Sequence, residues 1–100
     1  MHDCFGFEVM LTVERQAHIL QHPEMAGLEE AIPDTLVSPK EVRLSRSDQS
    51  IRLFYQYYEN TPVDAKWLCV VVKYLEANAL VVTAYLTDKL KTGDSLWPKK

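Results

Sequence analysis

The spacing of hydrophobic residues changes near the middle of the chain. Before Pro39 apolar positions recur every three to four residues, as in amphipathic helices, and after it they alternate with polar positions, as in strands. The pattern therefore predicts an α+β fold: a short N-terminal strand and two helices packed on a four-stranded antiparallel sheet.

The first half of the chain is expected to begin with a short apolar strand over residues 7–11. Thr12 is a typical N-cap for a helix over 13–21, which the residue before Pro23 ends because it avoids the α region. The face of this helix expected to pack on the sheet consists of Val13, Ala17 and Leu20.

A second amphipathic helix is expected over residues 23–31, since proline suits the first turn of a helix. Pro33 is expected to restart or kink it, and residues 34–37 to add one more turn before Ser38-Pro39 stops it.

The second half predicts four strands, over residues 41–47, 50–58, 66–76 and 80–88. Tight turns are expected at 47–49 and 77–78, a longer loop at 60–64 and a loop-like tail through Gly93 and Trp97. Strands connected this closely should form an antiparallel meander.

Strand alternation assigns one face of the sheet to the helices and leaves a polar patch on the other. The patch is expected to contain Arg43, Arg52, Lys73, Thr83 and Tyr85, backed by Phe54. Its three cations could bind a substrate anion. Ordinary solvent-facing residues of a one-sided sheet explain the same pattern equally well.

Length and composition predict one domain spanning residues 1–100, with no repeat or linker. The formal net charge of −3 argues against an indiscriminate nucleic-acid binder, but not against an enzyme that concentrates cations in one site. Cys4 and Cys69 form no CxxC motif, so both are expected to be structural thiols and no cofactor is expected. No signal-peptide pattern or membrane-spanning run is visible, which predicts a cytoplasmic protein without membrane contact.

Arg15, His18 and His22 lie on one stripe of the first predicted helix. A zinc site is not expected, because Ile19 stands where the HExxH motif needs glutamate. Histidine pKa values lie near neutrality, so the pair suits acid–base chemistry, and arginine suits phosphate. The alternative is structural: His22 caps the helix junction and His18 is a surface residue.

Four stretches of the chain are similar to those of a known family: Leu11-Thr12-x-Glu14-Arg15-x-x-His18-Ile19-x-x-His22-Pro23-Glu24-Met25, Val70-Val71-Val72-Lys73, Val81-Val82-Thr83-Ala84-Tyr85 and Leu96-Trp97. Through them the chain resembles the phage-type Barnase–EndoU–Colicin–RelE-like nuclease group over residues 9–97. It implies a helical unit on a four-stranded antiparallel sheet and metal-independent RNA cleavage, with His18, His22, Arg15, Thr83 and Tyr85 as site residues. The chain departs from the group in its negative charge and in Pro33, which interrupts a helix expected to be continuous.

The leading hypothesis is therefore a toxin-like endoribonuclease that cleaves RNA by attack of the 2′-hydroxyl, with Arg43, Arg52 and Lys73 binding substrate. A small antitoxin protein is the expected partner of such an enzyme. The alternative is a non-catalytic interaction module that keeps the fold and forms a homodimer through the aromatic strand over residues 54–58.

Overall fold

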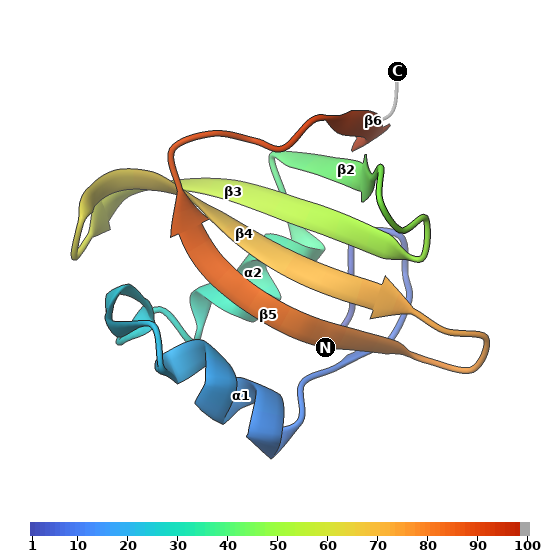
Figure 1. Ribbon diagram of the computed structural model, residues 1–100, viewed down its shortest axis with the longest axis horizontal. Helices are drawn as coiled ribbons and strands as arrows, with labels where there is room; N and C mark the ends of the chain where they lie inside the picture. The colour runs from blue at the N-terminus through green and yellow to red at the C-terminus, as the bar shows by residue number, and fades with distance from the viewer. Residues whose placement is uncertain (99–100) are drawn as a thin grey trace.

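The computed structural model describes residues 1–98 and contains a six-stranded mixed sheet with its helices on one face (Figure 1). In chain order the elements are β1 (Val9–Met10), α1 (Val13–Leu20), the 3₁₀ turn η1 (Pro23–Met25), α2 (Ala31–Val37), β2 (Glu41–Ser45), β3 (Ile51–Thr61), β4 (Asp64–Tyr74), β5 (Ala79–Thr87) and β6 (Gly93–Trp97). The strand order is β1-β5-β4-β3-β2-β6. The expected α+β class is confirmed, whereas the expected four-stranded antiparallel sheet is wrong.

Strands β2 to β5 form the antiparallel meander that alternation predicts. The loop expected at 60–64 is instead a tight hairpin, because β3 continues to Thr61 and β4 starts at Asp64. Asp64 adopts a φ of 70°, and its carbonyl accepts a hydrogen bond from the Thr61 hydroxyl. This turn lets the two longest strands extend beyond β2 as a projecting hairpin, visible at the left of Figure 1.

The two strands missing from the expected sheet come from opposite ends of the chain. β1 pairs parallel with the start of β5, through Val9 with Ala79 and Met10 with Leu80. β6 pairs antiparallel with β2, so residues 93–97 are a strand rather than the expected loop. Both additions satisfy backbone groups that an edge strand of the meander would leave unpaired.

Helix α1 begins where the sequence predicts, because the Thr12 side chain accepts a hydrogen bond from the Arg15 amide at 3.2 Å. Its packing face differs from the prediction. Ile19 is 1% exposed, whereas Val13 is 83% exposed and Leu20 is 40% exposed. The eight-residue helix contacts β5 and lies beside it in Figure 1, so one buried side chain anchors it.

The second expected helix is split. Pro23–Met25 form only the 3₁₀ turn, and Gly27 has a φ of +83°, which interrupts helical geometry. Helix α2 then starts at Ala31 with Pro33 in its first turn, where no amide hydrogen is needed. No helix within residues 1–98 is long and apolar enough to cross a membrane.

The sheet has a helix face and an open face. The helix face carries the main core, in which Phe54, Val70 and Val72 pack with Ile19 and Leu36. On the open face Leu53, Tyr55 and Cys69 form a smaller cluster, against which Leu90 of the 88–92 segment packs. Strand β3 is thus buried on both faces.

The expected face assignment of β3 was therefore inverted. Phe54 lies opposite Val42 and Val70 in the helix-face core, and Arg52 shares its side of the strand. Arg52 and Phe54 do not belong to the open face. Arg43, Lys73, Thr83 and Tyr85 do, since Arg43 and Val71 pair with Leu53, and Thr83 and Tyr85 pair with Val71 and Cys69.

Candidate functional site

The open face contains a pocket of about 400 Å³ beside the β2–β3 turn, here named the open-face pocket. Its lining residues come from the β2–β3 connection, the three central strands and the segment after β5: Ser45, Arg46, Ser47, Ile51, Leu53, Val71, Thr83, Tyr85, Lys91 and Thr92. The floor is apolar and the rim carries hydroxyl groups and two cations. Pockets of this composition fix a polar group above an apolar base.

Arg46 and Lys91 give the open-face pocket a positive charge that no carboxylate in its lining opposes. Within residues 1–98, Arg46 forms no ion pair, and the Lys91 ammonium lies 5.9 Å from the centre of the Tyr85 ring. The hydroxyl groups of Ser45 and Ser47 are hydrogen-bonded to each other at 3.1 Å, which leaves one O–H donor of this pair. Together with that donor and the Thr83 hydroxyl, the two cations offer several hydrogen-bond donors to one anion.

The backbone of Lys91 is held on the open face by two side chains. Its amide donates to the Tyr55 hydroxyl at 3.0 Å, and its carbonyl accepts from Arg43 Nη1 at 2.9 Å. Arg43 Nε also donates to Glu41 Oε1 at 2.7 Å. Arg43, expected to bind substrate, therefore positions Lys91 and is itself neutralised by Glu41.

Tyr85 lines the open-face pocket but cannot act as a base near neutral pH. Burial raises the pKa of its phenol, and the neighbouring Cys69 thiol raises that pKa further. Burial likewise raises the pKa of Cys69 to about 11. The Tyr85 hydroxyl is buried beside the Cys69 thiol, and no nitrogen or oxygen atom of the described residues forms a hydrogen bond with it. Tyr85 and Cys69 are neutral under physiological conditions.

Lys73 is occupied by an ion pair next to the open-face pocket. Its ammonium donates to Asp48 Oδ2 at 3.2 Å. The pKa of Asp48 is lowered to about 2, mainly by hydrogen bonds from the Ser50 hydroxyl and amide and then by Lys73. Lys73, also expected to bind substrate, is thus paired with a carboxylate that stays ionised.

The histidines predicted to be catalytic lie on and just after α1. The rings of His18 and His22 meet edge to face with centres 6.2 Å apart. His22 Nδ1 is 4.0 Å from Glu24 Oε1, and Arg15 and His18 are exposed. The structure brings these three predicted residues to one solvent-facing surface beside β5.

The structure does not join the α1 residues to the open-face pocket. Across residues 1–98, no hydrogen bond, ion pair or ring contact links His18 or His22 to Thr83 or Tyr85. The remaining histidine, His2, pairs with Glu8 in the N-terminal segment (residues 1–8) at 2.8 Å. The lining of the open-face pocket contains no histidine and no carboxylate.

Arg46 and Lys91 are the pocket cations that the sequence pattern did not identify. Arg46 lies in the strand expected over residues 41–47, where alternation puts it on the side of Val42 and Leu44, but β2 ends at Ser45 and Arg46 belongs to the β2–β3 connection. Lys91 lies in a segment expected to be a loop, where alternation assigns no face. Three-dimensional proximity to Thr83 is what selects them.

Among the described residues, no group of three or more histidine, cysteine or acidic side chains is arranged to hold a metal ion. Comparisons with protein-family models, curated proteins and solved structures gave no match.

Proposed function

We propose that this protein is a metal-independent endoribonuclease that binds the RNA backbone in the open-face pocket. The observation that carries the proposal is the pairing of Arg46 and Lys91 with hydroxyl donors, without a carboxylate in the lining, on a chain of formal net charge −3. Because the chain as a whole is negatively charged, it does not attract RNA nonspecifically, and two cations in one pocket favour the binding of a phosphate group at that place.

The proposed chemistry divides between two places. Arg46 and Lys91 bind one phosphate of the RNA, with Thr83 as a hydrogen-bond donor. From the open-face pocket the single-stranded RNA passes over β5 to α1. There one histidine of the His18–His22 pair takes the 2′-hydroxyl proton and the other protonates the leaving oxygen. Arg15 stabilises the charge that develops on the phosphate.

The fold proposed with this function is that of the Barnase–EndoU–Colicin–RelE-like group. The α1 motif with Arg15 and His18, and the β5 motif with Thr83 and Tyr85, are the residues that support this assignment. The terminal strands β1 and β6 are additions around the expected meander. The proposal includes an inhibitory protein partner, because free ribonuclease activity would harm the producing cell.

The test is cleavage of single-stranded RNA in EDTA by the full chain, with product ends analysed by mass spectrometry. We expect 2′,3′-cyclic phosphate ends and no cleavage when the 2′-hydroxyl is replaced by hydrogen. His18→Ala should lower the rate by about a hundredfold or more. Arg46→Ala should weaken RNA binding. The slope of the logarithm of the RNA-binding constant against the logarithm of the salt concentration should decrease by about the amount expected for one phosphate contact.

Lys89→Ala is the matched control, since Lys89 is exposed and does not line the open-face pocket. It should leave both cleavage and binding near those of the unmodified protein. Intact RNA after long incubation with folded protein would refute the enzymatic proposal. Equal loss of binding in Lys89→Ala and Arg46→Ala would refute the pocket.

A non-catalytic RNA-binding protein is the second candidate, favoured by the absence of histidine from the pocket lining. It predicts binding that depends on Arg46 without any cleavage. A homodimer through residues 54–58 receives less support, because Phe54 and Tyr55 are 0% exposed within one chain and only Tyr57, at 41%, faces solvent substantially.

A further inference from the structure

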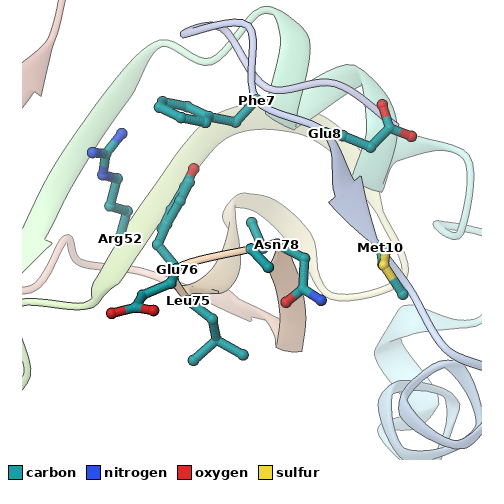
Figure 2. A pocket seen from close by; sticks show the side chains of 10 residues that line it. Phe7, Glu8, Met10, Arg52, Leu75, Glu76 and Asn78 are labelled. Atoms are coloured by element: carbon teal, nitrogen blue, oxygen red, sulfur yellow. The ribbon is translucent and has the colours of Figure 1, made fainter.

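A second and larger cavity, of about 560 Å³, lies on the helix-face side of the sheet between the N-terminal segment and the β4–β5 turn (Figure 2). It is named here the N-terminal cavity. Its volume falls in the range of small-molecule sites. It is lined from the helix-face side of the sheet by Arg52 and Tyr74, and none of its lining residues belongs to the open-face pocket.

Arg52 in the wall of the N-terminal cavity is held by aromatic rings alone. Its guanidinium carbon lies 4.3 Å from the ring centre of Tyr74, 4.8 Å from that of Phe5 and 5.8 Å from that of Phe7. Within residues 1–98 it has no ion pair and no side-chain hydrogen bond. Ring contacts fix the orientation of the guanidinium but leave its N–H donors without acceptors.

Exposed apolar side chains gather around the same cavity. Phe7 is 51% exposed, Met10 45% and Leu75 49%, and the Phe7 ring meets Tyr74 edge to face at 5.8 Å. Figure 2 shows Phe7 and Met10 on one side of the cavity and the turn bearing Leu75 and Asn78 on the other. An apolar patch of this kind, next to an arginine with free donors, fits a ligand with an apolar body and one anionic group.

Two carboxylates of the lining limit the charge that such a ligand can carry. Glu8 is already paired, 3.4 Å from the Met1 amine and 2.8 Å from His2, and in Figure 2 its carboxylate points away from the cavity. Glu76 is exposed in the β4–β5 turn. Its negative charge at the rim disfavours ligands with more than one negative charge.

We propose that the N-terminal cavity binds a monocarboxylate attached to an aromatic or aliphatic body, with the carboxylate on Arg52 and the body against Phe7, Met10 and Leu75. The same chemistry is offered by a free organic acid and by the C-terminal carboxylate of a peptide that ends in an apolar residue. The site is independent of RNA cleavage and stands or falls separately from it.

The test is titration of the ¹⁵N-labelled full chain, followed by amide NMR, with matched acid and amide probes. The free pair is 3-phenylpropionate and 3-phenylpropionamide, and the peptide pair is acetyl-Gly-Phe with a free or an amidated C-terminus. We expect at least one acid to shift the amides of residues 7, 10 and 75–79 and to bind about tenfold more tightly than its amide. The acid that binds more tightly identifies the source of the carboxylate.

Arg52→Gln should weaken the acid about tenfold and leave the amide unchanged. Because Arg52 also contacts three rings, a second variant, Leu75→Glu, leaves Arg52 in place, replaces an apolar contact at the rim with a negative charge and should abolish binding of the acid. Its matched control is Val37→Glu, at a position 53% exposed on α2 and outside the cavity lining, which should bind normally. Equal affinity for acid and amide, no shift with any probe, or equal loss in Val37→Glu and Leu75→Glu would overturn the proposal.

Discussion

Three titratable side chains meet beneath the 88–92 segment on the open face: Tyr55, Cys69 and Tyr85. Tyr55 and Cys69 are 0% exposed, and burial raises their pKa values to about 12 and about 11 respectively. Burial also raises the pKa of Tyr85. Each group is therefore neutral in the folded state, and each resists ionisation more strongly than in the unfolded chain.

This cluster predicts loss of stability in alkali. A group whose pKa is higher in the folded than in the unfolded state stabilises the protein at pH values below its unfolded-state pKa. That stabilisation is lost as the pH rises to the folded-state pKa. The contribution of Cys69 to the unfolding free energy should be constant up to about pH 9, the ordinary thiol pKa, and fall between there and pH 11. In Cys69→Ala urea denaturation should show lower stability at neutral pH but a shallower alkaline decline. Parallel curves for the two proteins would contradict the role of Cys69.

Residue types in the candidate site were easier to predict than their positions. Histidines on one helical stripe and hydroxyls on one strand were identifiable because both periods are fixed by the backbone. The pocket cations were not, since the strand expected over residues 41–47 ends before Arg46 and Lys91 lies in a connection to which no period applies. Arg52 was assigned to the wrong face because Leu53, Phe54 and Tyr55 are all buried. Both faces of β3 are therefore apolar at these positions, and the alternation of apolar and polar residues does not show which face carries the helices.

At the scale of elements, local pattern predicted the meander well and the helices partly. The strands alternate over five or more residues, so their existence and order are clear from the sequence. Helix α1 has only one buried residue, Ile19, and its apolar stripe was therefore a poor guide to packing. The break at Gly27 depends on a positive φ that Gly permits but does not require.

Strand β6 depends on the absence of a side chain at Gly93. A Cβ atom there would lie 2.2 Å from the Leu44 carbonyl oxygen, so the backbones of β2 and β6 could not keep their present spacing. Gly93→Ala should destabilise the protein by about 1–3 kcal/mol and free β6 from β2. Urea denaturation and amide exchange of residues 93–97 measure the two effects.

Asp94→Ala is the control for this substitution, because Asp94 is an exposed residue of the same strand. It should change stability by no more than about 0.5 kcal/mol. Normal protection of the β6 amides in Gly93→Ala would show that the contact with Leu44 is not what places the strand.

At the scale of the whole molecule, one buried acid ties the N-terminal segment to the sheet. Asp3 is 3% exposed, and its carboxylate accepts hydrogen bonds from the amides of Phe5 and Phe7, both at 2.9 Å, and from the Tyr74 hydroxyl. Desolvation raises the pKa of Tyr74, and its hydrogen bond to Asp3 raises it further. The segment thus closes on β4 through polar groups removed from water.

Asp3→Ala should therefore detach the N-terminal segment, since it leaves the Tyr74 hydroxyl and two amides without their acceptor. We expect a loss of about 2–4 kcal/mol and fast amide exchange over residues 3–9. Tyr74→Phe removes one of the three bonds and should cost less, about 1 kcal/mol. A larger loss in Tyr74→Phe than in Asp3→Ala would show that the Tyr74 hydroxyl is held by a group other than the Asp3 carboxylate.

Pairing between distant parts of the chain marks the limit of prediction from sequence. β1 reaches β5 across about seventy residues and β6 reaches β2 across about fifty, as the partners Val9–Ala79 and Ser45–Gly93 show. Neither β1, with two residues, nor β6, with Gly and Asp, has a strong strand pattern of its own. Local periodicity therefore could not identify the strands with which β1 and β6 pair.

The same topology orders the steps of folding. Turns of a few residues let the β2–β5 meander form quickly. The terminal strands β1 and β6 pair more slowly, because closing much longer loops costs more conformational entropy. During synthesis Lys91 and Thr92 emerge after every strand of that meander. A nascent chain can consequently hold the whole β2–β5 meander before the segment that completes the lining of the open-face pocket has emerged.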